Sequence, residues 1–154
     1  MIKIVISEQK LYHRRKTGVV CVYPISSASK GTGSELGSLK TPLGKHRVFE
    51  KIGEGMPKNT AFIGREPIGI YRDKIRLLRA DWILTRILWL EGLESGLNKG
   101  GKVDSCQRYI YIHGTNEERL IGLPASHGCI RMRNDDVMNL FEHVSEAERV
   151  LIKP

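Results

Sequence analysis

Ser126-His127-Gly128-Cys129-Ile130-Arg131 is the stretch that decides the fold class and the chemistry of this chain. A cysteine attacks as a thiolate, and a nearby imidazole both lowers the pKa of the thiol and accepts its proton. Gly128 permits a sharp turn and a close approach of substrate. The planar guanidinium of Arg131 suits a carboxylate. The stretch therefore predicts an activated thiolate at Cys129 beside an anion-binding arginine.

A strand is predicted just upstream, because residues 108–113 alternate in character. On such a strand Tyr109, Tyr111 and His113 share one face, which we expect to line a cleft. His113 ends this face and is the expected general base. His127 is expected to orient the thiol, to contact substrate or to stabilise the loop.

The turn around the cysteine supplies the other groups that a nucleophilic site needs. Ser126 is expected to fix the turn by bonding to backbone. The backbone N–H groups of Gly128 and Cys129 are the expected donors to a developing oxyanion. Arg131 follows Cys129 by two residues, so both side chains face one cleft if this piece is extended. We expect Arg131, Ser126, Gly128 and Tyr111 to contact substrate.

A different interpretation treats the same residues as metal ligands. His113, His127 and Cys129 are ligand types that suit Zn²⁺, but no fourth ligand with convincing spacing accompanies them. The thiol mechanism is therefore favoured, with no metal and no cofactor. The remaining cysteines lack such neighbours, so we expect Cys21 in the core and Cys106 to be incidental. An odd, sparse set of three cysteines fits a reducing compartment rather than a disulfide framework.

Elsewhere the pattern predicts a mainly β domain with one short C-terminal helix. The helix begins near Asn134, its expected N-cap, and carries an apolar face at the spacing i, i+3, i+4, i+7. That face consists of Val137, Leu140, Phe141 and Val144. The further strands are predicted at residues 2–6, 19–23, 46–52, 83–90 and 149–152. The run 83–90 also fits a helical stripe, and strand is favoured.

Long connections are predicted between these elements. Residues 8–16 are expected to form a polar hairpin connection, and residues 26–43 a long loop rich in Ser, Gly and Thr. Residues 53–61 and 92–104 are glycine-punctuated loops. The loop-rich middle insertion that they bracket is a candidate lid over the site.

Length and charge limit the classes of function. A chain of 154 residues is most simply one domain, spanning residues 1–154. No apolar run is long enough to span a membrane, so no membrane insertion is expected. The net charge of +8 comes from scattered residues without interleaved aromatics, which excludes a typical nucleic-acid platform. This charge attracts polycarboxylate ligands, and it is equally explained by solubility.

The segment from Ser126 to Met132, together with His113-Gly114-Thr115, resembles the signature of the L,D-transpeptidase catalytic domain. Thr41-Pro42-Leu43-Gly44 is similar to a Thr-Pro-x-Gly block of that family, and residues 24–28 match the strand end that precedes it. The likeness runs over nearly the whole chain. Two features depart from the family. Residues 114–125 form a gap slightly shorter than is usual in the mycobacterial-type enzymes, and the common export signal is missing.

The resemblance implies a β-sandwich with the cysteine on a loop or strand end above it. Family enzymes cut the bond between the L-centre of meso-diaminopimelate and the terminal D-alanine in peptidoglycan stem tetrapeptides. Carried over, Cys129 matches the nucleophile and His113 the base, while the Gly114 carbonyl orients the imidazole. Arg131 matches a substrate-side cation. His46, which follows the Thr-Pro-x-Gly block, is a further candidate for substrate contact.

Two peptidoglycan activities share this acyl-enzyme. With water as acceptor the chain is an L,D-carboxypeptidase that trims muropeptides during recycling, and with an amine it is a cross-linking L,D-transpeptidase. The first is favoured because residues 1–16 do not read as a signal peptide, which predicts a cytoplasmic protein if Met1 is the native start. A location in the periplasm or cell envelope follows if it is not. His13, His46 and His143 are expected at the surface or at helix ends.

Overall fold

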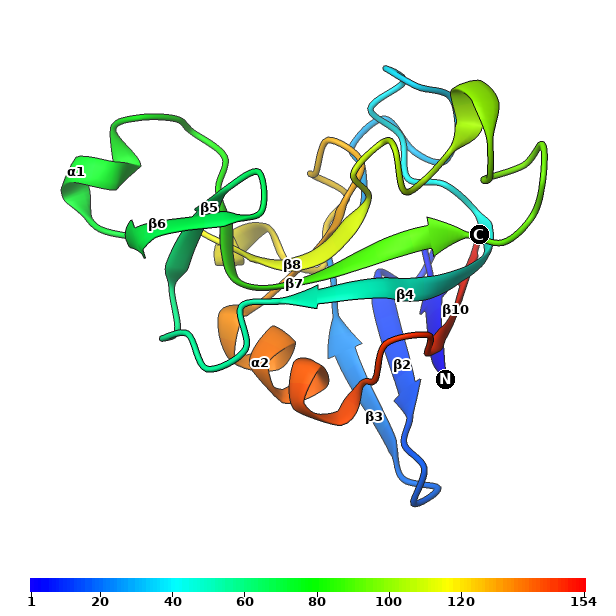
Figure 1. The fold of residues 1–154 in the computed structure, drawn as a ribbon, viewed down its shortest axis with the longest axis horizontal. Helices are drawn as coiled ribbons and strands as arrows, with labels where there is room; N and C mark the ends of the chain where they lie inside the picture. The colour runs from blue at the N-terminus through cyan, green and yellow to red at the C-terminus, as the bar shows by residue number, and fades with distance from the viewer.

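The computed structural model describes residues 1–154, which fold around one sheet of ten strands (Figure 1). The strands are β1 (Ile2–Val5), β2 (Lys10–Arg14), β3 (Val20–Pro24), β4 (Gly44–Ile52), β5 (Thr60–Ile63), β6 (Glu66–Ile70), β7 (Ile83–Gly92), β8 (Tyr111–Thr115), β9 (Ile130–Met132) and β10 (Arg149–Lys153). The helical elements are α1 (Asp73–Arg76), α2 (Asn134–His143) and the 3₁₀ turns η1 (Gly101–Val103) and η2 (Glu118–Leu120). The mainly β fold with one substantial C-terminal helix is confirmed.

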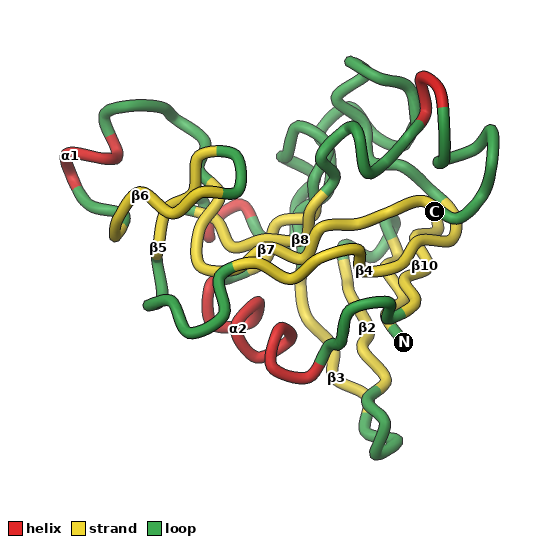
Figure 2. The backbone as a smooth tube through the Cα atoms, viewed as in Figure 1, coloured by secondary structure: helices red, strands yellow, loops and turns green.

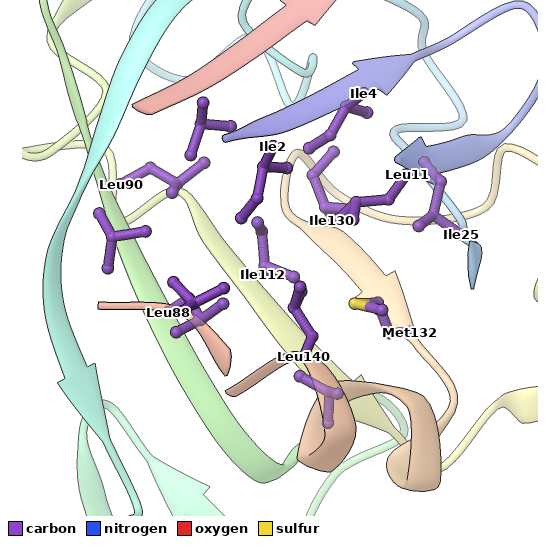
Figure 3. Packing of buried hydrophobic residues seen from close by; sticks show 14 of the residues in the cluster. Ile2, Ile4, Leu11, Ile25, Leu88, Leu90, Ile112, Ile130, Met132 and Leu140 are labelled. Carbon is purple, nitrogen blue, oxygen red and sulfur yellow. The ribbon is translucent and has the colours of Figure 1, made fainter. Parts of the chain in front are cut away.

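The sheet is continuous and curled. Its strand order is β3-β2-β1-β10-β4-β7-β5-β6, while β8 pairs with β7 and, in parallel, with β9. The curl brings the two halves of the sheet face to face, so the two layers of the expected sandwich come from one sheet. Figure 3 shows Ile2 and Ile4 of β1 in the same buried cluster as Ile112 of β8 and Ile130 of β9. These side chains are fully removed from water, and each contributes about 1.5–3 kcal/mol of burial free energy.

Helix α2 closes one side of this core. Its predicted apolar face is confirmed, since Val137, Leu140, Phe141 and Val144 are all buried. The acidic side chains in its first turn complement the positive end of the helix dipole. The predicted N-cap is wrong, because Arg133 holds the cap position and makes no side-chain cap bond. Asn134 is buried instead and turns its side chain toward β8.

The segment predicted as a polar connection contains strand β2. Leu11 and His13 point inward and are fully buried, while Lys10 and Arg14 point outward. The sequence did not show the alternation of apolar inward and polar outward residues in β2, because one of the inward residues is a histidine. His13 and His46 were expected at the surface, yet both are buried. His13 Nε2 pairs with a glutamate, and His46 bonds to Ser105 and to a backbone carbonyl. Only His143 is exposed as expected.

The middle of the chain is more regular than predicted. The loop expected at residues 53–61 ends in β5, which forms a hairpin with β6 and also pairs with the first residues of β7. This hairpin and α1 project from the left side of the molecule (Figure 1). The loops expected at residues 26–43 and 92–104 contain no named strand. Figure 2 shows the long loops gathered at one end of the sheet, near β7 and β8.

Candidate active site

Cys129 lies at the start of β9, beside the strand that carries the predicted base. In the parallel pairing of β8 with β9, Arg131 lies opposite His113, and the same register extended back places Cys129 beside Tyr111. The N–H of Tyr111 donates to Cys129 Sγ at 3.3 Å, and the thiol donates to the Tyr109 carbonyl at 3.3 Å. The sulfur is therefore held between two backbone groups of the aromatic segment.

The turn before the cysteine is fixed by hydroxyl groups. Ser126 Oγ donates to the Cys129 carbonyl at 2.6 Å and accepts the Gly128 N–H at 3.2 Å, as the sequence predicted for a turn-fixing serine. Thr41 Oγ1 donates to the Gly128 carbonyl at 2.9 Å, so the Thr-Pro-x-Gly block anchors the turn. Gly128 has a φ of 133°, which favours glycine. Because the Gly128 N–H is already bonded, only the Cys129 N–H remains available to an oxyanion.

His113 is buried and has one defined tautomer. Its Nδ1 donates to the Gly114 carbonyl at 2.6 Å, because a carbonyl can only accept. Nε2 makes no intramolecular hydrogen bond. Burial lowers the pKa of His113 to about 4, against the opposing effect of the Gly114 carbonyl. At neutral pH the imidazole is therefore neutral, with its Nε2 lone pair ready to accept a proton. The orienting contact predicted for Gly114 is present.

The thiol of Cys129 is also neutral at rest. Loss of hydration among the groups packed around the sulfur raises its pKa to about 11, although the Tyr111 N–H acts in the opposite direction. The expectation of a preformed thiolate is therefore wrong for this state of the protein. The resting pair consists of a thiol and a neutral base, so the thiolate has to form as the reaction begins.

A bulge in β7 supports the base from the other side. The register of β7 against β8 shifts between Leu84 and Ile87, directly opposite His113 and Gly114, and Thr85 has a φ of 72°. Bulges of this kind are common next to active sites. A Cβ on Gly114 would lie 2.6 Å from the Leu84 carbonyl oxygen, so only glycine fits this close approach.

Asn134 completes this support through three side-chain hydrogen bonds, two of them buried. It donates to the Thr115 carbonyl at 2.8 Å and to Glu118 Oε1 at 2.7 Å, and it accepts the Thr85 hydroxyl at 2.6 Å. Its side-chain oxygen would also clash with a Cβ on Gly114. Helix α2 is thereby tied to the strand that carries the base. Sequence reasoning assigned Asn134 to the cap and missed this role.

Arg131 is not an open cation in this structure. Its side chain is 4% exposed and its Nη2 lies 2.7 Å from Asp81 Oδ2, while His127 Nδ1 lies 3.1 Å from the same oxygen. Burial alone would raise the pKa of the Asp81 carboxyl, but the charge of Arg131 and its hydrogen bond hold it below its usual value. Asp81, in the middle insertion, thus covers Arg131, and sequence reasoning missed it.

A groove of about 200 Å³ opens at Cys129. Its lining includes the exposed His127 and Tyr109, the half-buried Arg108, and a loop that contains Leu36 and Leu39. Arg108 binds that loop by donating to the Lys40 and Gly33 carbonyls and to Ser38. Tyr111, predicted to contact substrate, is buried against the Trp89 ring and does not line the groove.

Cavity volume alone does not identify the active site. A larger cavity of about 450 Å³ lies on β1 to β3, between Lys3, Tyr12 and Val20, and it holds neither a nucleophile nor a base. The structure contains no cluster of three His, Cys, Asp or Glu side chains that suits a metal ion, so the zinc alternative is unsupported. Cys21 packs at the edge of the core, and Cys106 is half-buried in a loop. Neither helix has the length and apolar character needed to cross a membrane.

Known proteins with similar sequences are L,D-transpeptidases. The probable L,D-transpeptidase YbiS of Escherichia coli is 30% identical over 94% of this chain and 41% of its own length. The probable L,D-transpeptidase ErfK/SrfK of Salmonella typhimurium is 56% identical over 29% of this chain and 15% of its own length. The chain thus spans about two fifths of the length of the first relative.

Solved structures show the same fold. The Ldtfm–avibactam carbamoyl enzyme superposes with a TM-score of 0.60 at 19% identity, covering 99% of this chain and 48% of that one. L,D-transpeptidase 3 from Mycobacterium tuberculosis with a faropenem-derived adduct gives 0.57 at 16% identity, covering 99% and 59%. The L,D-transpeptidase catalytic domain family matches residues 1–152. With the Cys129 turn, the oriented His113 and this match over nearly its full length, the chain belongs to the L,D-transpeptidase catalytic domain family.

Proposed function

We propose that this chain is a cysteine acyltransferase that cuts peptidoglycan stem tetrapeptides at the bond between meso-diaminopimelate and D-alanine. The observation that carries the proposal is the neutral His113, pinned by the Gly114 carbonyl on the strand beside Cys129. Cys129 Sγ attacks the carbonyl carbon of the scissile amide while its proton passes to His113 Nε2. The proton then moves to the amine of D-alanine, which leaves, and a thioester on Cys129 remains.

Coupling of proton transfer to attack follows from the two pKa shifts. A thiol with a pKa near 11 and an imidazole with a pKa near 4 do not form an ion pair in the resting site. As negative charge passes to the carbonyl oxygen, the free N–H of Cys129 is in place to donate to it. The base therefore acts during the attack, and its burial keeps it unprotonated over the whole neutral range.

We further propose that water resolves the thioester, which makes the chain an L,D-carboxypeptidase. Ligand pockets usually measure roughly 300–1,000 Å³, and the groove at Cys129 measures about 200 Å³. That space suits the end of one peptide better than two stem peptides together. Three free cysteines are compatible with a reducing compartment, so the proposal places the activity in cytoplasmic muropeptide recycling.

Incubation of the purified protein with a disaccharide tetrapeptide tests both the cleavage of the D-alanine bond and the choice of water as acceptor. Release of D-alanine with tripeptide as the sole muropeptide product supports the carboxypeptidase, whereas a cross-linked dimer supports the transpeptidase. Cys129→Ala should abolish turnover, and His113→Ala should lower it by about 10²–10⁴. Cys106→Ala is the matched control, because that thiol is also free and half-buried. Full activity in His113→Ala would refute the assignment of the base.

A further inference from the structure

Arg65 is held flat against the aromatic side chains next to the groove. It lies in the two-residue turn between β5 and β6 and reaches back over β7. Its guanidinium carbon is 4.6 Å from the ring centroid of Trp89 and 5.2 Å from that of Tyr109. Its Nη1 donates to the Tyr111 hydroxyl at 3.2 Å. Three contacts on different rings therefore restrain one arginine.

This guanidinium has unused hydrogen-bonding capacity. Arginine carries five N–H donors, and the bond to Tyr111 is the one hydrogen bond that Arg65 makes. It forms no ion pair, whereas Arg131 is neutralised by Asp81. Arg108 also lies near Cys129, but its N–H groups donate to the loop that forms part of the groove wall. Arg65 thus makes no ion pair and has a preset orientation. Its hydrogen bond to Tyr111 raises its pKa, and the more distant carboxylate of Glu50 adds to that effect.

Tyr111 connects Arg65 to the nucleophile Cys129. The Tyr111 N–H donates to Cys129 Sγ, and the hydroxyl at the far end of the same residue accepts from Arg65. Tyr109 makes a second link, because its carbonyl accepts the thiol, its ring lies under the guanidinium and its side chain lines the groove. Arg65 itself is not part of the groove lining, but the ring of Tyr109, over which its guanidinium lies, is.

We propose that Arg65 is a specificity-determining residue that binds a carboxylate of the substrate. The inference rests on the proposed function, because a stem tetrapeptide carries two carboxylates near the scissile amide. One terminates D-alanine and the other belongs to the D-centre of meso-diaminopimelate. A planar guanidinium matches a carboxylate with two parallel hydrogen bonds. Stacking on Trp89 and Tyr109 reduces the entropy that this contact costs.

The test compares the tetrapeptide with two amidated forms, one at the D-alanine carboxylate and one at the distal carboxylate of diaminopimelate. We expect the wild-type protein to prefer the acid over one amide by about 10- to 100-fold in kcat/KM, the range typical of hydrogen bonds to a charged group. The amide that loses activity identifies the carboxylate. In Arg65→Gln this preference should disappear, and Arg65→Lys should keep part of it.

Arg79→Gln is the matched control. Arg79 also belongs to the middle insertion and lies over a tryptophan, 4.9 Å from the Trp82 ring, but Trp82 does not line the groove, whereas Tyr109 beneath Arg65 does. It should retain the wild-type preference. The same preference should appear as a difference in Kd when the tetrapeptide and its amides are titrated into Cys129→Ala by calorimetry, and it should vanish in the double variant with Arg65→Gln.

The outcomes separate this inference from the proposed function. An unchanged acid-to-amide ratio in Arg65→Gln, in turnover and in Kd, would overturn the role of Arg65 and leave the acyl-transfer proposal standing. Absence of turnover together with an Arg65-dependent preference in Kd would overturn the acyl-transfer proposal and leave the role of Arg65 standing. Circular dichroism and thermal melting of each variant exclude misfolding, and Arg65→Lys serves if Arg65→Gln does not fold.

Discussion

The ion pair between Asp81 and Arg131 gives a sharp prediction about stability. Arg131 follows the nucleophile on β9 and its side chain is 4% exposed, whereas Asp81 is 39% exposed and belongs to the middle insertion. Asp81→Ala removes the carboxylate and leaves the guanidinium buried without its counter-charge. The pair therefore links the insertion to the catalytic strand, and its loss should lower the free energy of unfolding of the whole domain.

The magnitude follows from the burial of the partner that remains. Breaking a buried ion pair from one side typically costs about 3–5 kcal/mol, because the remaining charge is stranded. Asp81 is partly solvated, so water fills some of the vacated space and the lower end of the range applies. We expect Asp81→Ala to lower the free energy of unfolding by about 3 kcal/mol.

Urea denaturation followed by tryptophan fluorescence measures this loss. Asp73→Ala is the matched control, since Asp73 lies in the same insertion and pairs with Arg76 at 3.8 Å in full exposure to solvent. Such surface pairs contribute about 0–1 kcal/mol. If Asp81→Ala destabilises the protein no more than Asp73→Ala does, the pair is not a structural tie and the reasoning fails.

Two more predictions concern the base. Asn134→Ala removes the acceptor of the Thr85 hydroxyl and a donor to the Thr115 carbonyl, and each buried hydrogen-bonding group left unsatisfied costs about 1–3 kcal/mol. We expect the free energy of unfolding to fall by about 3 kcal/mol. We also expect kcat to fall by a larger factor than KM changes. The exposed Glu142 on the same helix provides a control, because its side chain makes no hydrogen bond and Glu142→Ala should cost less than about 1 kcal/mol; equal losses would contradict the proposed support. The second prediction concerns acid. The folded pKa of His113 is about 4 and its ordinary value is 6.5, so the unfolded chain binds the extra proton between those values. This residue's contribution, about 3 kcal/mol, is complete above pH 6.5 and is lost as the pH falls toward 4. Unfolding measured across that window should therefore be steeper for the wild type than for His113→Gln, and identical slopes would show that the imidazole is not buried.

Local patterns predicted most of the regular structure. The helix from Asn134 was visible because its apolar residues recur with the helical period. The strand at β7 was favoured over a helical stripe because alternate residues from Ile83 to Trp89 fit one strand face. The turn at Cys129 was visible because Gly128 and Ser126 have specific turn chemistry. Strand β2 was missed because burial of His13 depends on a glutamate far along the chain, which no local pattern shows.

The electrostatic environment of the site was the least predictable part. Arg131 was expected to face the cleft beside Cys129 as an open cation for a substrate carboxylate, because the two side chains lie two residues apart on an extended segment. Its partner Asp81 precedes β7 and approaches only once the sheet is assembled. The same holds for the pKa values of Cys129 and His113, which burial dominates. Residue type and spacing identified the chemistry, whereas its protonation state depends on the packed structure.

The place of β10 in the sheet has a consequence for biosynthesis. β10 lies between β1 and β4, so it joins β1–β3 to the strands that carry the site. A nascent chain can pair β1 with β2 and β2 with β3 early, but that small sheet has no neighbour until residues 149–153 leave the ribosome. Contacts of such long sequence separation form slowly and leave apolar faces exposed meanwhile. Chaperone binding to the nascent chain should therefore persist until β10 has emerged and paired with β1 and β4.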